Sequence, residues 1–232
     1  MKALKDYKIS IEYKHLKQHA PGGVYLIPSF DVPMRLFFGV IFLRRGLYTN
    51  GIFKFRVILP EDYNDVDTFP RVFFDAPIFP YNPMVDEKTG ELNIKISYPN
   101  WDPQKHYLIT LLTHLKKIFY VKSFDKDYNF EHCGNKEALQ LFNSNKKEYI
   151  ARVMKCVKES QARIYANQSS RSTVVFKEDA LQYQILREMM EIKIKQQTSS
   201  NSSSLQHLSR SGIFDMVSDS MQGWNSTEGL DS

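Results

Sequence analysis

Hydrophobic positions along the chain follow a helical period near the start and a strand-like period after it. Leu4, Tyr7 and Ile11 fall at helical spacing before the turn Pro21-Gly22-Gly23, which predicts a helix over about residues 3–19. Four short runs rich in β-branched and aromatic residues then predict strands. They are Val24–Ile27, Phe37–Leu43, Ile52–Leu59 and Val72–Phe74. Turn-forming residues separate the runs, and Asn50-Gly51 is typical of a hairpin, so we expect a four-stranded antiparallel meander.

The helical period returns after Pro103. A continuous apolar stripe at i, i+3, i+4 and i+7 predicts the strongest helix of the chain, which would cover the apolar face of the sheet: Leu108, Leu111, Leu112, Leu115, Ile118 and Phe119. Further apolar positions between Ala138 and Ile164 predict additional helices. A helix, a meander and then helices on one face of the sheet make an α+β fold.

The chain divides into one domain and an appendage. The domain is expected over residues 3–166, followed by a C-terminal extension over 167–197 and a tail over 198–232. Residues 199–232 include eleven serines. Such a segment has too little apolar surface to offset the entropy lost on ordering, so we expect the tail to be disordered.

The extension contains a candidate helix over residues 178–195. Four apolar residues share one face of it: Leu181, Ile185, Met189 and Ile192. This face either packs back on its own domain or enters the groove of a partner protein, and the pattern does not separate the two. A second candidate contact surface is the set of apolar residues in the tail: Ile213, Phe214, Met216 and Trp224.

Composition argues against several classes of function. The net charge is +5, but the basic residues occur as isolated pairs without a recognition motif, which does not favour nucleic-acid binding. The two cysteines, Cys133 and Cys156, lack metal-ligand spacing, and we expect no cofactor. The chain has no apolar run that resembles a signal peptide or an integral membrane segment. We therefore expect a cytoplasmic protein.

Several motifs resemble those of ubiquitin-conjugating enzymes (E2s), over roughly residues 3–165. Phe69–Phe74 resembles the segment that opens their fourth strand, Trp101-Asp102-Pro103 resembles their Trp-x-Pro, and Asn135–Tyr149 resembles the start of their last helices. Longer strings are similar to the Fused Toes/crossbronx family: Gly23–Ser29, Phe38–Phe42, Arg45–Tyr48, Gly51–Phe55 and Gly90–Leu92. The resemblance implies the E2 (UBC) fold, a missing active-site cysteine, and a place in complexes with Hook proteins, which link endosomes to dynein.

The resemblance also implies where catalytic residues would stand. E2s place the cysteine that carries ubiquitin eight residues before the Trp of Trp-x-Pro, and counting back from Trp101 reaches Asn93. An amide side chain has no ionisable nucleophile, so no thioester can form on it. Cys133, beside His132, is a weak alternative nucleophile.

An E2 also needs a His-Pro-Asn turn, whose Asn stabilises the oxyanion. If the family spacing is kept, Asn82-Pro83-Met84 occupies this place, with Asn82 for His and Met84 for Asn. If Phe79 sets the register instead, Pro80-Tyr81-Asn82 stands there and Asn82 replaces the oxyanion-binding Asn. Both registers remain open.

Three functions are compatible with these residues. The first is an inactive scaffold or adaptor subunit, implied by the family resemblance to act in Hook- and dynein-linked vesicle trafficking. The second is a ubiquitin-binding E2 variant that assists an active E2 or recognises ubiquitinated cargo. The third is an enzyme with displaced chemistry, which Asn93 disfavours. The expected partners are accordingly Hook-like coiled-coil adaptors, ubiquitin or an active E2.

Overall fold

The computed structural model describes residues 2–63, 65–76, 78–124, 133–166, 172–177, 185–193 and 195. The chain forms two compact units, Met1–Lys177 and Glu178–Ser232. Leu181 and the predicted tail over 198–232 lie outside the described residues.

The sheet in the first unit is the predicted antiparallel meander. Its strands are β1 (Val24–Pro28), β2 (Leu36–Phe42), β3 (Ile52–Ile58) and β4 (Arg71–Phe74), in the order β1-β2-β3-β4. Asn50 takes a φ of 67° in the loop between β2 and β3, a conformation that Asn and Gly adopt at low cost. Gly39 of β2 is required by packing, because a Cβ there would collide with the ring of Phe55.

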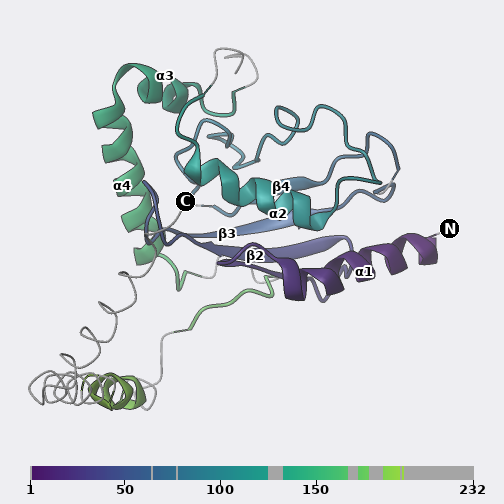
Figure 1. Cartoon of the computed structure of the whole chain (residues 1–232), viewed down its shortest axis with the longest axis horizontal. Helices are drawn as coiled ribbons and strands as arrows, with labels where there is room; N and C mark the ends of the chain where they lie inside the picture. The colour runs from purple at the N-terminus through teal and green to yellow at the C-terminus, as the bar shows by residue number, and fades with distance from the viewer. Residues whose placement is uncertain are drawn as a thin grey trace, which may run out of the picture. The chain divides into compact units, whose positions relative to one another are not determined.

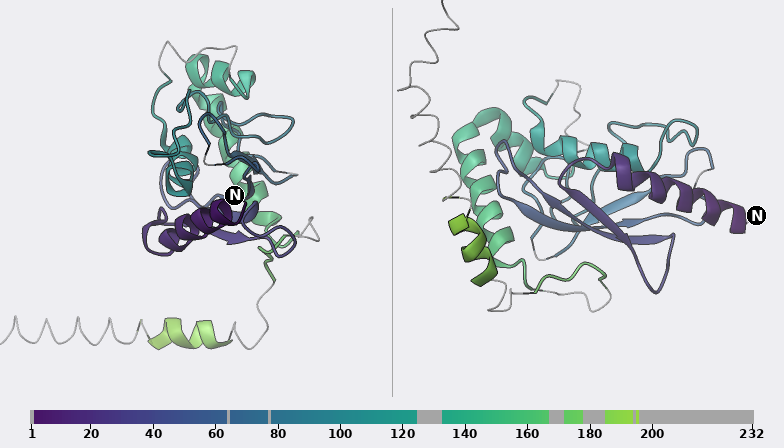
Figure 2. Two further views of the ribbon diagram at one scale, coloured as in Figure 1. Left: turned by 90° about the vertical axis from the view of Figure 1, so that its right-hand side faces the viewer. Right: turned by 60° about the horizontal axis from the view of Figure 1, so that its bottom comes forward.

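The helices are α1 (Lys2–His19), α2 (Leu108–Lys117), the 3₁₀ helix η1 (Ile118–Tyr120), α3 (Lys136–Ser144) and α4 (Lys146–Ala162). Asn135 and Asn145 begin α3 and α4, since their side chains accept hydrogen bonds from the amides of Ala138 and Glu148. Figures 1 and 2 show α3 and α4 at one end of the sheet and the N-terminal half of α1 at the opposite end. The predicted α+β arrangement is confirmed.

Helix α1 packs through a different face from the one that its spacing suggests. Leu4, Tyr7 and Ile11 are 61 %, 63 % and 40 % exposed, whereas Ile9 and Leu16 are buried. Glu12 lies on the inner side, where its carboxylate accepts hydrogen bonds from the Leu108 amide and the Tyr63 hydroxyl, both at 3.0 Å. A charged residue interrupts the inner apolar stripe because it caps the first turn of α2.

The core lies between the sheet and α2. The stripe that predicted α2 is buried there as expected, with Leu108, Leu111, Leu112 and Leu115 inaccessible to solvent. Rings from β3, β4 and η1 pack together at centroid distances of 5.7–6.3 Å: Phe53, Phe74 and Phe119. Trp101 is also fully buried and contacts Phe69, Tyr98 and His106. The segment between β4 and α2 is therefore anchored although it contains neither a helix nor a strand in its described part.

Candidate functional site

A groove surrounds the position of the expected cysteine, and the segment between β4 and α2 supplies most of its lining. The groove has a volume of about 580 Å³. It is lined by Phe69, Pro70, Arg71, Asp86, Thr89, Glu91, Leu92, Asn93, Ile94, Lys95, Cys133 and Gly134. A tight turn shapes one wall, because the Asp86 carboxylate accepts hydrogen bonds from the amides of Lys88 and Thr89. Gly90 completes this turn at a φ of 72°, where a Cβ would lie 2.6 Å from the Phe79 ring.

Asn93 is half-buried in this groove. Its backbone amide donates a hydrogen bond to the Met84 carbonyl at 2.9 Å, next to the isolated bridge between Val85 and Leu92. The structure thus brings together two of the positions expected from the sequence, Asn93 and Met84. The Met84 side chain is buried in the core, so it does not face the groove. A thioether lacks a polar hydrogen to donate to an oxyanion.

Asn82 points into the core and supports the loop. Its side-chain amide donates hydrogen bonds to the Ile118 carbonyl at 3.0 Å and to the Tyr48 hydroxyl at 3.2 Å. Its side-chain oxygen accepts one from the Met84 amide at 2.9 Å. Asn82 is 1 % exposed and is absent from the groove lining. Both hydrogens of the amide are engaged, which leaves neither for an oxyanion in the groove.

Two buried tyrosines hold the same loop against α4. The Tyr48 hydroxyl donates to the Tyr81 carbonyl at 2.6 Å and lies 2.8 Å from the Tyr149 hydroxyl. Burial raises the pKa of Tyr149 to about 12 and that of Tyr48 well above its usual range, so both stay neutral. Cys156 of α4 adds a contact from its thiol to the Phe79 carbonyl at 3.1 Å. These residues position the loop and do not reach the groove.

The structure places Cys133 in the same groove as Asn93, although forty positions separate them. Cys133 is 8 % exposed, and its Sγ lies 3.1 Å from the Pro83 carbonyl oxygen and 3.0 Å from that of Asn135. A thiol can donate to such carbonyls, but a thiolate would be repelled by their negative ends. The geometry therefore disfavours the ionised, nucleophilic form. His132 lies outside the described residues.

His114 of α2 is a buried residue that the sequence alone did not single out. It is 5 % exposed and its ring lies 5.4 Å from that of Tyr98. Burial is the main cause that lowers its pKa from 6.5 to about 4. A hydrogen bond with the Asn93 backbone acts in the opposite direction, and the positive charge of Lys117 lowers the pKa further. The spacing contained the signal, because position 114 is three after Leu111 on the buried stripe.

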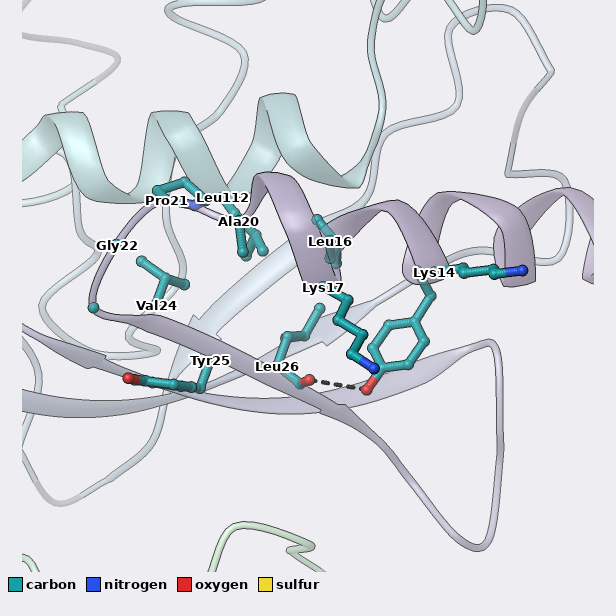
Figure 3. A pocket seen from close by; sticks show the side chains of 12 residues that line it. Lys14, Leu16, Lys17, Ala20, Pro21, Gly22, Val24, Tyr25, Leu26 and Leu112 are labelled. Atoms are coloured by element: carbon teal, nitrogen blue, oxygen red, sulfur yellow. Dashed lines mark hydrogen bonds between the residues drawn. The ribbon is translucent and has the colours of Figure 1, made fainter.

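A second pocket, of about 600 Å³, lies between α1, β1 and α2 (Figure 3). Leu16, Leu26 and Leu112 contribute to its apolar lining. Tyr13 also lines it, and its hydroxyl donates a hydrogen bond to the Leu26 carbonyl at 3.1 Å. Among the described residues that line it, Lys14 and Lys17 are charged, and none is Cys, His, Asp or Glu. These lining residues thus provide no thiolate, imidazole or carboxylate that could act as nucleophile or base near neutral pH.

The second unit presents an apolar helical face. Residues 185–193 are helical and all are exposed. Ile185, Met189 and Ile192, which the sequence marked, are 50–54 % exposed, and Leu186 and Met190 widen the face at 51 % and 63 %. Leu186 and Met190 lie outside the narrow stripe at i, i+4, i+8 and i+11 by which the sequence marked this face. Such a face is what a helix that enters a partner's groove would present.

Within the described ranges, no three His, Cys, Asp or Glu side chains are grouped as metal ligands would be. Each helix that the structure describes is too short or too polar to span a lipid bilayer.

Known proteins provide a comparison for this arrangement. The family model for ubiquitin-conjugating enzyme matches residues 8–157. A crossbronx homologue from Anopheles gambiae is 37 % identical over 164 residues, which cover 70 % of this chain and 69 % of that protein. A second from Culex quinquefasciatus is 34 % identical over 179 residues, or 75 % of each chain. Crossbronx of Drosophila virilis is 32 % identical over 162 residues, or 69 % of this chain and 65 % of its own. The chain belongs to the ubiquitin-conjugating enzyme family and, within it, to the crossbronx-like proteins.

Proposed function

We propose that the protein is a catalytically inactive E2-like module that acts as a scaffold or adaptor subunit in a protein complex. The observation that carries this proposal is the chemistry of the groove. In the register that the family resemblance implies, Asn93 takes the place of the catalytic thiol. The thiol of Cys133, in the same groove, lies within hydrogen-bond distance of two carbonyl oxygens. Neither group supplies a thiolate that could hold ubiquitin as a thioester.

The oxyanion arrangement supports the same proposal. The Met84 side chain has no polar hydrogen to donate. The Asn82 side chain donates both of its amide hydrogens, to the Tyr48 hydroxyl and the Ile118 carbonyl. An E2 that lacks both nucleophile and oxyanion donor keeps the surface of the fold but not its reaction. What remains for it is to bind other proteins.

The first test is thioester formation. We expect no reducing-agent-sensitive ubiquitin adduct when the purified chain is mixed with activating enzyme, ubiquitin and ATP, because no thiolate is available in the groove. A non-reducing gel detects the adduct, and an active E2 in the same reaction serves as the positive control. An adduct that disappears in a Cys133→Ser variant would show that the displaced thiol is catalytic and would overturn the proposal.

The exposed helix over 185–193 is the candidate contact with a partner. We propose that its apolar face binds a coiled-coil protein, of the Hook kind if the chain assembles as its resemblance implies. Ile185, Leu186 and Met189 are each at least 50 % exposed, and such side chains are the anchors from which stable interfaces are built.

A pair of matched variants tests this contact. Replacing Ile185 and Met189 by Ser is expected to reduce binding to a purified Hook-type coiled coil at least 100-fold, since two central anchors of about 2 kcal/mol each are lost. Replacing Glu188 and Glu191 by Gln on the same helix should change binding by less than threefold. Titration calorimetry measures both. Undiminished binding by the Ser variant would eliminate this surface, and binding of ubiquitin instead of the coiled coil would favour the ubiquitin-binding function.

A further inference from the structure

The outer face of the sheet is apolar along β2, which is unusual for a face that none of the described helices covers. Side chains alternate along a strand, so Phe37 and Ile41 enter the main core while Phe38 and Val40 point to the other side. A wet outer face normally carries polar residues at such positions. Here all four outer positions of β2 are apolar: Leu36, Phe38, Val40 and Phe42. Phe38 and Val40 are nevertheless only 4 % exposed.

Residues 172–177 cover this face. Val174 is 8 % exposed and packs with Phe38 and Val40 in a cluster separate from the main core. The Phe176 ring meets the Phe42 ring edge-on at 6.2 Å. Figures 1 and 2 show the segment on the side of the sheet opposite α2. The sequence had placed these residues in the extension that follows the domain.

Contacts alternate along this covering segment. Val174 and Phe176 face the sheet, whereas Val175 between them is 50 % exposed. β2 is an interior strand, hydrogen-bonded to β1 and β3, so its backbone has no free edge to offer. The segment is accordingly recognised by side chains, through a β-branched residue and an aromatic residue two positions apart.

Lys54 of β3 contacts the chain both before and within this segment. Its Nζ donates to the Ile164 carbonyl at 2.9 Å, just after α4, and lies 5.0 Å from the centroid of the Phe176 ring. The chain therefore leaves Lys54 at residue 164 and returns to it at residue 176. A tether this short holds the segment at an effective concentration of about millimolar or higher.

We propose that the outer face of β2 is a binding surface for an extended segment with a β-branched residue and an aromatic residue at i and i+2, and that residues 172–177 occupy it as a ligand within the chain. A segment of the same pattern from another protein then binds only when the internal one leaves. The surface uses residues other than those of the Asn93 groove, and this inference holds whether or not that groove is catalytic.

The test uses the full-length chain and a synthetic peptide of residues 172–177. In a Val174→Ser/Phe176→Ser variant, the peptide is expected to shift the methyl NMR signals of Leu36 and Val40 in a saturable way. The wild-type chain and a Val175→Ser variant, which changes the exposed residue between the two anchors, should need at least tenfold more peptide. Methyl signals detect millimolar binding, so weak affinity for a hexapeptide does not hide the effect. A peptide with Ser at both anchor positions serves as the control ligand.

Two further measurements keep the result interpretable. The methyl signals of Ile41, on the inner face of β2, report whether the double variant is folded, and they are expected to match those of the wild type. Sedimentation is expected to show a monomer for the double variant. Equal shifts in all three proteins, or no shift in any, would overturn the proposal. Dimerisation of the double variant through this face would overturn it too, because the occupant would then be a second copy of the sheet.

Discussion

An Asn93→Cys variant is expected to accept ubiquitin as a thioester but to release it to lysine about 10²–10³-fold more slowly than an ordinary E2, the usual cost of losing one oxyanion donor. Two observations give the reason. Met84 is buried and donates no hydrogen bond, and the Asn82 amide is bound to the Ile118 carbonyl and the Tyr48 hydroxyl. Restoring the thiol therefore restores the carrier but not the stabilisation of the transition state.

Charging the variant by exchange with a small ubiquitin thioester makes the measurement independent of recognition by activating enzyme. The discharge rate with free lysine is then compared with that of an active E2 under the same conditions. A Cys133→Ser change in the same background controls for the second groove thiol. Discharge within tenfold of the active enzyme would contradict the prediction and favour the register in which Asn82 is the oxyanion donor.

Acid is expected to destabilise the fold through His114 by about 3 kcal/mol. Its pKa is lowered from 6.5 to about 4 in the folded chain, chiefly by burial. Between these values the unfolded chain binds a proton that the folded chain does not, so the unfolding free energy falls as the pH decreases. The loss should begin near pH 6.5 and be complete near pH 4, and each pKa unit contributes about 1.4 kcal/mol.

Chemical denaturation at pH 7, 5.5 and 4 measures this effect. Carboxylates also contribute to acid unfolding, so the informative quantity is the difference between the wild type and a His114→Gln variant. The variant should lose about 3 kcal/mol less than the wild type between pH 7 and pH 4. A His15→Gln variant, at an exposed position of α1, controls for the loss of an imidazole as such. Parallel pH profiles for wild type and His114→Gln would exclude a buried neutral imidazole.

Local pattern was sufficient for the order and type of the elements. The predicted bounds of β2 and β3 each lie within one residue of the observed bounds. The leucine stripe after Pro103 forms α2. The reason is that periods of 2 and 3.6 arise directly from the burial of one face. The strings similar to the Fused Toes/crossbronx family led to the same family as the crossbronx homologues of mosquitoes and Drosophila.

Long-range contacts decided most of what concerns the site. Counting from Trp101 led to Asn93, but only the tertiary structure places Cys133 in the same groove and turns Asn82 towards the Ile118 carbonyl. These relations depend on segments that are far apart in the chain, and no local period encodes them. The sequence near position 82 can be aligned with the His-Pro-Asn turn in two registers. In either register the Asn82 amide hydrogens are bound to the Tyr48 hydroxyl and the Ile118 carbonyl, a fact that only the tertiary structure provides.

The two faces of β2 show the same division. The sequence by itself determined that residues 36–42 form a strand, because they are β-branched, aromatic and bounded by turns. A strand that is apolar on both sides must be covered on both, but its own sequence does not say by what. The tertiary structure supplies α2 and the core on one side, and Val174 and Phe176 on the other. The period of the sequence indicates which side chains are buried. The residues that they pack against are decided by contacts between segments that are distant in the chain.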